Sequence, residues 1–553
     1  MHDTSPKPPS ALQEYLPKIL TVWREGYGLA QLKADALAGL TVAIVALPLS
    51  MAIAIASGVG PERGLYTAIV GGFLVSALGG SRYQIGGPAG AFIVLVSACV
   101  MQTGVAGLIT ATFLSGFMLL AAGALRLGTY IKFIPYPVTV GFTAGIGLII
   151  FASQIKDLFG LTLTGAEPGE VLEKLSALWA AKATVTPAAV GIALLSIAVI
   201  MGLRRLRPHW PGMLIAVAAA SVVVAALGLP VETIGSRFGA LPNLPPLPAL
   251  PMLTGEAIRA ALPFAFSFAL LGAIESLLSA VVADGMSGAR HRSNAELVGQ
   301  GVANIGSALF GGFCVTGTIA RTATNVRAGS SGPISGILHA LFVLVFMALA
   351  APLAAYIPLA ALAGVLAVVA WGMVEKEELW VLVRGSRGDA LIVLTTFLLV
   401  VFRDLTTGIL VGFALAGLVF IKRMSDETEL HAGAFEATGG GQRGDLLVYK
   451  LRGPFFFGSA AQIGGVLDRI ADRPQVFAID FTEVPMIDSS GARSFEVLAR
   501  KMHRKGGQLC IVGAPPQVRR VLLAQGLKEP HVLYLPDLAA AEAMTGPPPD
   551  PVG

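Results

Sequence analysis

The stretch LPFAFSFALLGAIESLLSAVVA, residues 262–283, decides the fold class of this chain. As a helix it is long enough to cross the hydrocarbon core of a bilayer, and its only charged residue is Glu275. Similar apolar runs recur from Ala36 to Ile421, and the loops between them carry nearly all the charge. Of the 553 residues, 54% are hydrophobic and 13% are charged, against about 25% charged in soluble proteins. The sequence therefore predicts an α-helical polytopic membrane protein.

Composition also argues against several other classes. The net charge is +5, but Lys and Arg are scattered through short loops, so no nucleic-acid partner is expected. Cys99, Cys314 and Cys510 share no pair spacing, which predicts neither disulfides nor a metal site. Because no nucleophile and base pair or cofactor loop is evident, we expect no catalytic residues, no cofactor and no enzymatic activity.

The apolar runs and basic loops predict the organisation of the membrane part. We expect a transport domain over residues 35–425 with about 14 segments, two of them too short to span. Residues 1–34 are expected to form an N-terminal segment. Basic residues concentrate in alternate loops, for example Arg204, Arg205 and Arg207. Since cytoplasmic loops carry the excess of Lys and Arg, this pattern places both termini in the cytoplasm.

A weak internal repeat relates the two halves of the membrane part. SALGG at 76–80 recurs as SALFGG at 307–312, and a Gly- or Pro-interrupted segment follows each copy: GGPAGAF at 86–92 and TGTIAR at 316–321. Paired interrupted segments of this kind indicate a transporter site near the bilayer midplane. Two helix N-termini at one point would attract an anion. The alternative is that these glycines serve close helix packing only.

Two charged residues interrupt the apolar segments. A carboxylate at mid-span is a functional hypothesis by default, and Ser279 lies one turn from Glu275 on the same face. Arg321, at the start of the second short helix, could clamp an oxyanion through two hydrogen bonds. Because Glu275 and an anion would repel each other, protonation of Glu275 would link anion binding to proton uptake. A structural hydrogen bond for Ser279, and a gate or lipid contact for Arg321, are the alternatives.

A compact α/β domain is expected over residues 433–545, where charges become dense. Strands are predicted at 446–451, 476–481 and 508–513, and helices at 460–471, 489–505 and 516–525. Ser489 follows Asp488 at a predicted helix start. It is either an ordinary capping residue or an acceptor of phosphate.

Several motifs together resemble the SulP family of anion transporters, which carry a C-terminal STAS domain. They are LPLSMA (47–52), GLYT (64–67), GGSR (79–82), GAIESLL (272–278), IARTA (319–323), NVRAG (325–329) and DSSG (488–491). Within the family the chain is most similar to bacterial C4-dicarboxylate transporters and, less closely, to cyanobacterial bicarbonate transporters.

The resemblance implies two inverted seven-span repeats of 14 segments, with two broken half-helices, a core domain that moves against a gate domain, and the small STAS domain. It further implies a multi-pass protein of the bacterial inner membrane, a homodimer, and a cytoplasmic regulatory protein that binds the STAS domain. The residues that would surround the anion are Pro88, Ala89, Gly90, Ala91, Glu275, Thr318, Ile319, Ala320 and Arg321.

The expected activity is proton-coupled uptake of C4-dicarboxylates such as succinate, fumarate or aspartate. Sulfate and bicarbonate are the alternative substrates, and a passive anion channel or a nucleobase transporter of the same fold are alternative classes. Two departures from the relatives matter. Ala89 stands where they have Thr, which removes a hydroxyl contact, and Glu275 stands where the sodium-coupled relatives have Asp, which favours protons over sodium.

Overall fold

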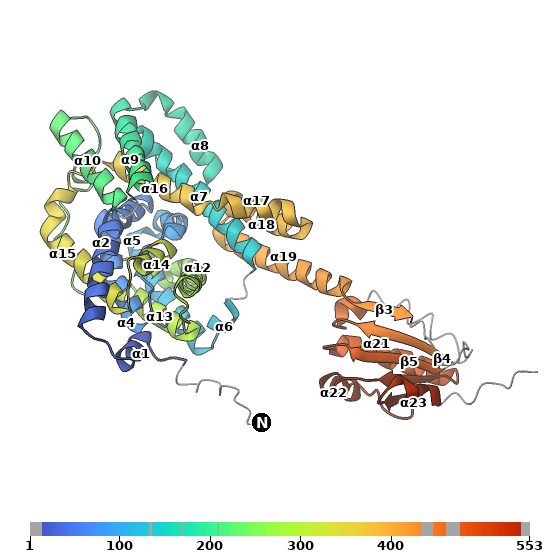
Figure 1. Ribbon diagram of the computed structural model, residues 1–553. Coiled ribbons are helices and arrows are strands. Elements are labelled where there is room, and N and C mark those ends of the chain that lie inside the picture. Colours follow the sequence, from blue (N-terminus) through green and yellow to red (C-terminus); the bar gives the residue numbers. More distant parts are fainter. Residues whose placement is uncertain are drawn as a thin grey trace, which may run out of the picture. The chain divides into compact units, whose positions relative to one another are not determined.

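The computed structural model describes residues 14–131, 135–165, 167–168, 170–207, 210–432, 446–460 and 476–543 (Figure 1). Contacts divide the chain into two compact units, residues 1–413 and 414–553. The first unit is helical, and the second is built on a five-stranded sheet.

Fourteen helical segments of the described residues account for the membrane part. Eight runs are long and apolar enough to cross a membrane: α2 (Leu29–Ala56), Gly90–Ala124, α7 (Tyr136–Phe159), α9 (Pro187–Leu206), α12 (Gly255–Ser287), α15 (Ile334–Ala354), Leu359–Gly385 and α19 (Leu405–Asp426). The run Gly90–Ala124 bends at Gly104, whose φ of +69° is in the left-handed region that glycine tolerates, and so supplies a ninth segment.

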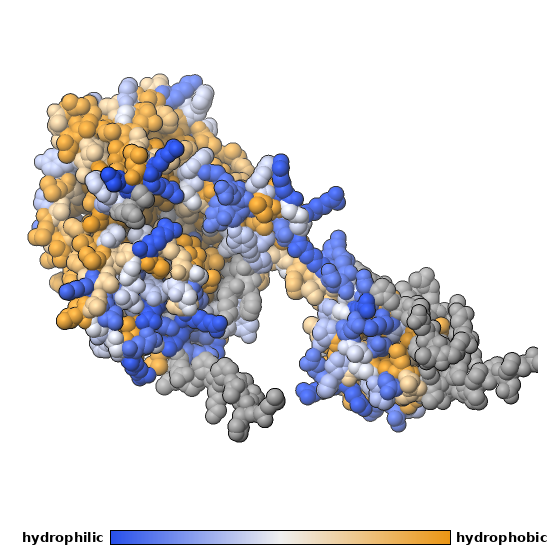
Figure 2. Space-filling view, viewed as in Figure 1, coloured by the Kyte–Doolittle hydropathy of each residue, from blue (hydrophilic) through white to orange (hydrophobic). Residues whose placement is uncertain are grey.

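Five shorter segments complete the set. They are the stretch α3 (Pro61–Tyr66), η1 (Thr67–Gly71) and α4 (Gly72–Leu78), then α10 (Gly212–Leu227), α13 (Ser293–Leu309), α14 (Ile319–Arg327) and α18 (Arg387–Phe402). Short peripheral helices are α1 (Lys18–Arg24), α6 (Gly128–Ile131), α8 (Val171–Ala180), η3 (Lys182–Thr184) and α11 (Ile234–Phe238). α17 (Lys376–Gly385) is the second part of the run Leu359–Gly385. Orange side chains cover much of the visible surface of the first unit in Figure 2, as expected for lipid-facing spans.

The segments pack as two groups. In the core group, α5 (Ile93–Ala124) packs on α12 and α13, while α2 packs on α15 and α14. In the gate group, α7 packs on α16 (Leu359–Met373) and α18, and α9 packs on α10 and α16. α19 joins the gate group, because Gly408 and Gly412 approach Val400 and Thr396 of α18.

A two-stranded ladder holds the two halves of the chain together inside the core group. β1 (Gly86–Gly87) pairs antiparallel with β2 (Thr316–Gly317), Gly86 facing Gly317 and Gly87 facing Thr316. The 3-10 turn η2 (Gly90–Phe92) and α5 follow β1, and α14 follows β2. A short helix thus begins just after each strand of the ladder, as expected for the two interrupted segments.

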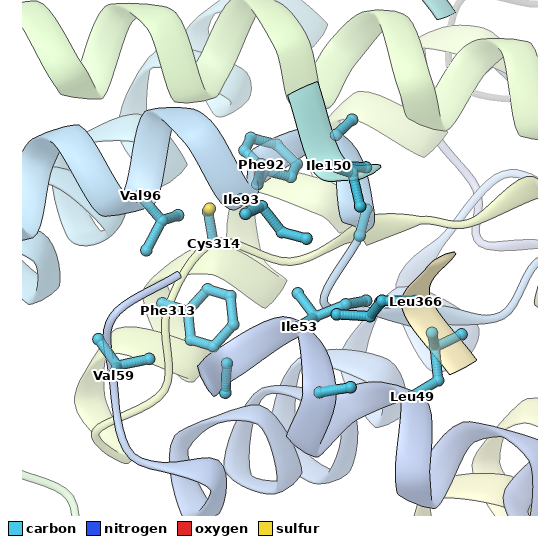
Figure 3. Packing of buried hydrophobic residues seen from close by; sticks show 14 of the residues in the cluster. Leu49, Ile53, Val59, Phe92, Ile93, Val96, Ile150, Phe313, Cys314 and Leu366 are labelled. Carbon is cyan, nitrogen blue, oxygen red and sulfur yellow. The ribbon is translucent and has the colours of Figure 1, made fainter. Parts of the chain in front are cut away.

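The two groups meet through apolar side chains close to the ladder. Figure 3 shows Ile53 of α2, Phe92 of η2, Ile150 of α7 and Leu366 of α16 in one cluster. Each is at most 2% exposed. All three cysteines are free and buried.

The second unit is an α/β domain. Its sheet order is β3-β4-β5-β6-β7, with β3 (Glu429–Ala432) antiparallel to β4 (Leu446–Arg452). Parallel strands β5 (Val476–Glu483), β6 (Gln508–Val512) and β7 (Val532–Leu535) follow, with helices α21 (Ser489–Arg504), α22 (Pro516–Ala524) and α23 (Leu538–Ala543). The three predicted strands and two of the helices are confirmed. The predicted helix at 460–471 lies outside the described residues except for Ala460. β3 and β7 were not predicted.

Candidate functional site

The two broken helices begin at residues that leave their first N–H groups without side-chain caps. Ala89 precedes η2 in an extended conformation and has no side-chain acceptor. Thr318 precedes α14 in the same conformation, but its hydroxyl does not cap the helix and lies 3.5 Å from the carbonyl oxygen of Ile85 instead. Uncapped N–H groups and the positive ends of helix dipoles therefore come together beside the ladder.

The guanidinium of Arg321 lies across the ladder and joins the two broken helices. Arg321 is the third residue of α14 and is 2% exposed. Its Nη2 donates to Ser50 Oγ of α2 at 3.1 Å and to the carbonyl oxygen of Pro88 at 3.3 Å. A Cβ at Gly87 would collide with Nη1, so only glycine leaves room for this side chain.

Two nitrogens of Arg321, Nε and Nη1, have no hydrogen-bond partner within the described residues. A buried guanidinium with open donors is incomplete, since unpartnered buried donors are costly. An oxyanion satisfies both the charge and the two-point geometry. The structure thus places the predicted anion-binding side chain where two helix N-termini meet.

The opposite face of the ladder is occupied by Gln84. A Cβ at Gly317 would collide with its Nε2, which donates to Ser276 Oγ at 2.7 Å and to the Ser276 carbonyl oxygen at 3.2 Å. Ser276 in turn donates to Glu296 Oε1 at 3.1 Å. Glu296 Oε2 accepts from the backbone N–H groups of Gly80 and Ser81 at 2.8 and 2.9 Å.

This buried chain of hydrogen bonds was not predicted from the sequence. Gln84, Ser276 and Glu296 are at most 3% exposed. A usable signal for Gln84 is its position two residues before the Gly86-Gly87-Pro88 motif. Glu296 gives a weaker one, because a carboxylate in the first turn of a helix is ordinary.

Glu275 lies on α12, which packs against α14 and β2. Its side chain is 7% exposed and, within the described residues, makes no hydrogen bond or ion pair. Ser279 is fully buried, and its hydroxyl donates to Thr322 Oγ1 of α14 at 3.0 Å. Thr322 Oγ1 also accepts from the Ile85 N–H at 3.2 Å. Ser279 therefore connects α12 to α14, whereas Glu275 keeps a free carboxyl group.

The remaining predicted site residues are more deeply buried at the first broken helix than at the second. Pro88, Ala89 and Ala91 are buried, and Gly90 packs near Ile150 and Met373 of the gate group. Thr318 is buried, Ile319 is half-buried and Ala320 is exposed. Two cavities of about 250 and 260 Å³ lie elsewhere, one beside Asp157 and Arg237 and one beside Gln102 and Glu256. We place the site at the ladder, because the unpartnered Arg321 nitrogens are there.

In the second unit, Ser489 is the exposed first residue of α21. Asp488 caps this helix, its Oδ1 accepting from the Gly491 N–H at 2.7 Å and its Oδ2 from the Phe457 N–H at 3.1 Å. Capping is thus carried out by Asp488, and the Ser489 hydroxyl is left at the surface.

Comparisons with known proteins identify the family of each unit. Residues 32–396 match the model of the sulfate permease family, and residues 441–534 match the STAS domain. The chain is similar to the putative sulfate transporter YvdB of Bacillus subtilis, with 39% identity covering 91% of this chain and 95% of the relative. It is also similar to the bicarbonate transporter BicA of a Synechocystis strain, with 31% identity covering 89% of this chain and 90% of the relative.

Among solved structures, the murine Solute Carrier 26 family member A9 anion transporter in the inward-facing state aligns with a TM-score of 0.85. The alignment covers 99% of this chain and 96% of the murine chain at 19% identity, so it bears on the fold alone.

Proposed function

The chain belongs to the sulfate permease family of membrane anion transporters, and we propose that it is a secondary active transporter that takes up C4-dicarboxylates together with protons. One observation carries the proposal. The buried guanidinium of Arg321 lies at the ladder from which two uncapped helices start, and two of its nitrogens have no hydrogen-bond partner within the described residues. A carboxylate matches this arrangement, since planar two-point hydrogen bonding is what a guanidinium offers. Succinate, fumarate and aspartate are the proposed substrates.

The proposed coupling group is Glu275. Its carboxyl group is nearly buried and has no partner within the described residues, and α12 packs on the helix that carries Arg321. An ionised Glu275 would repel an incoming dianion, so binding of the anion and of a proton would favour each other. Protons are preferred to sodium, because a lone carboxyl group supplies too few oxygen ligands for a metal ion.

The surrounding organisation follows the family. We propose that the core group moves against the gate group across the apolar contact formed by Phe92 and Ile150. The protein is placed in the bacterial inner membrane as a homodimer with both termini in the cytoplasm. The second unit would bind a regulatory protein, with exposed Ser489 as the proposed site of phosphorylation.

Transport into proteoliposomes tests the proposal. Labelled succinate should accumulate above its external concentration when an inward proton gradient is imposed, and a sodium gradient should not replace it. Glu275→Gln should retain succinate exchange across the membrane but lose accumulation driven by the proton gradient. An unchanged response of Glu275→Gln to the gradient would sink the coupling role of this residue.

Sulfate and bicarbonate form the second candidate. The relatives named above are described as sulfate and bicarbonate transporters. An arginine with two open donors also fits these anions. Uptake of labelled sulfate or bicarbonate without uptake of succinate, in the same vesicles, would favour this candidate over the C4-dicarboxylates.

A further inference from the structure

Tryptophan is distributed unevenly over the chain. Its five positions are Trp23, Trp179, Trp210, Trp371 and Trp380. None lies between residues 24 and 178 or between 211 and 370, so the spanning helices α2 to α5 and α12 to α15 of the core group contain none. Trp179, Trp371 and Trp380 belong to α8, α16 and α17, which pack within the gate group. The gate group therefore carries tryptophans, whereas the spanning helices of the core group carry none.

Each of these three indole rings carries a cation on its face. Lys182 Nζ lies 4.4 Å from the Trp179 ring centroid, Lys376 Nζ lies 3.4 Å from that of Trp371, and the Arg384 guanidinium carbon lies 4.0 Å from that of Trp380. The rings are 71%, 62% and 57% exposed, so no described part of this chain covers them. We call them the three tryptophan–cation pairs.

The pairs of Trp179 and Trp380 lie near the two ends of one gate helix, α7. Trp371 lies beside the middle of α7, because its neighbours Ala370 and Met373 pack against Gly147. Thr186, just after η3 and Lys182, donates its N–H to the carbonyl oxygen of Phe159, the last residue of α7. α17 packs against α7 and α18 and ends where α18 begins. Gly141, near the start of α7, approaches Val393 in the first half of α18, so α17 lies towards the start of α7. The 24 residues of α7 give it a length of about 36 Å. The hydrocarbon core of a bilayer is about 30 Å thick, so the pairs of Trp179 and Trp380 fall near its two boundaries.

The exposed apolar surface beside the pairs fits the same position. On α8, Leu172, Leu175 and Trp179 follow helical spacing and are all exposed, while Val171 and Leu178 on the neighbouring face are buried. An amphipathic helix with an uncovered apolar stripe lies in the plane of a membrane interface. Tryptophan prefers this layer, where its ring is apolar and its N–H is wet, and a nearby cation meets lipid phosphate.

We infer that the Trp179–Lys182 and Trp380–Arg384 pairs bind lipid headgroup phosphates, one pair in each leaflet, and anchor the gate group in the bilayer. Within the described residues, the spanning helices of the core group contain no tryptophan, and Trp23 of α1, which packs on α4, has no cation on its ring. The core group therefore has no such anchor and is free to move relative to the lipid. This consequence rests on the proposed transport function, whereas the anchoring itself does not. The occupant is lipid: the pairs present cations to an anionic layer, and their apolar flank continues the exposed lipid-facing surface of α7 and α18, for example Phe151 and Leu394.

Fluorescence quenching tests the anchoring without reference to transport. Single-tryptophan forms of the full chain would keep only Trp179 or only Trp380, the other four positions being Phe. They would be reconstituted in phosphatidylcholine vesicles with bromine at defined depths on the acyl chains. Bromine near the headgroup should quench each ring about twofold, and bromine near the chain end should quench less. Strong quenching by aqueous iodide with no effect of brominated lipid would overturn the inference.

Two further measurements separate lipid from other occupants and anchoring from transport. If a second copy of this chain covered the rings, the quenching would fall as the protein-to-lipid ratio rises, and this result would also overturn the inference. Trp179→Ala with Trp380→Ala should slow anion uptake about threefold, while Trp23→Ala, the matched control outside the gate group, leaves it unchanged. Equal uptake by the double variant and by Trp23→Ala would contradict the inference that anchoring of the gate group supports movement of the core group. A chain that transports no anion would still give the quenching result, so the two proposals fail separately.

Discussion

Each face of the β1–β2 ladder is covered by one long polar side chain, and the two side chains have different roles. On one face Arg321 lies over Gly87, and on the other Gln84 lies over Gly317. Within the described residues, Arg321 leaves two donor nitrogens without a partner. Both N–H bonds of the Gln84 amide are used on Ser276, which is held in turn by Glu296, and only the acceptor Oε1 of Gln84 has no partner. We call the first the binding face and the second the holding face. Non-helical backbone of this kind is tolerated in a membrane protein where other parts of the protein bury it, and here one face is held by hydrogen bonds while the other keeps open donors.

The binding face should give the largest effect when its charge is removed. Arg321→Gln should lower uptake at limiting substrate by roughly 100-fold or more, because hydrogen bonds to a charged partner contribute about 1.5–3 kcal/mol each. Labelled uptake in proteoliposomes measures this loss. Arg321→Lys is the control, since it keeps the charge without the planar fork and should retain part of the activity. Equal uptake by Arg321→Gln and the parent chain would remove the binding face from the mechanism.

Matched alanine substitutions separate the two faces directly. Gly87→Ala should displace the guanidinium and lower uptake about tenfold with little change in melting temperature. Gly317→Ala should displace the Gln84 amide and lower the melting temperature of the purified protein. Adding Gln84→Ala to Gly317→Ala should recover part of that loss, because the collision is removed. If both single substitutions had the same effect on uptake and on melting, the distinction between the faces would be wrong.

Substitution of the buried carboxylate Glu296 on the holding face should lower the stability of the protein. Glu296→Gln replaces an acceptor-only group that takes two N–H groups and one hydroxyl by an amide whose NH₂ faces donors, which should destabilise the protein by about 2 kcal/mol. A thermal melt of the purified chain reports this change. Uptake per folded molecule should stay close to that of the parent. A normal melting temperature combined with lost uptake would show that Glu296 acts in transport rather than in the stability of the ladder.

The smallest effect is expected at the first broken helix. Ala89→Thr adds a hydroxyl that can accept a first-turn N–H, and a cap of this kind is worth about 1 kcal/mol. The added hydroxyl competes with the anion for the N–H, so KM should rise about fivefold. Ala89→Val has nearly the same shape without the hydroxyl and should leave KM unchanged. A fall in KM for Ala89→Thr would mean that the hydroxyl binds the anion.

The sequence was most informative where a single residue conflicts with its surroundings. Arg321 stands out because its charge interrupts an apolar part of the sequence. The two glycine-rich repeats, SALGG at 76–80 and SALFGG at 307–312, indicated the two broken helices that follow them. The ladder between them was not predicted, since two residues are too few for a strand pattern. Gln84 and Ser276 are 192 positions apart and are ordinary residues in their own segments, so their role depends on a contact that local patterns do not encode.

Prediction in the second unit succeeded for a different reason. β4, β5 and β6 are apolar runs in a polar domain, and their periodicity is a local property. β3 is short and follows directly on α19, which obscures its beginning. Ser489 was identified, but only the structure shows that Asp488 carries the cap and leaves that hydroxyl exposed.

The ladder also constrains how the protein is made. β1 belongs to the first half of the chain, and its partner strand is synthesised only after α13 has entered the membrane. Until then the N–H and C=O groups of Gly86 and Gly87 have no partner strand, and Gly87 lacks the side chain that covers it. Bare backbone is not tolerated in lipid. The nascent first half must therefore be held at the insertion machinery, in contact with water or protein, until the second half arrives to close it.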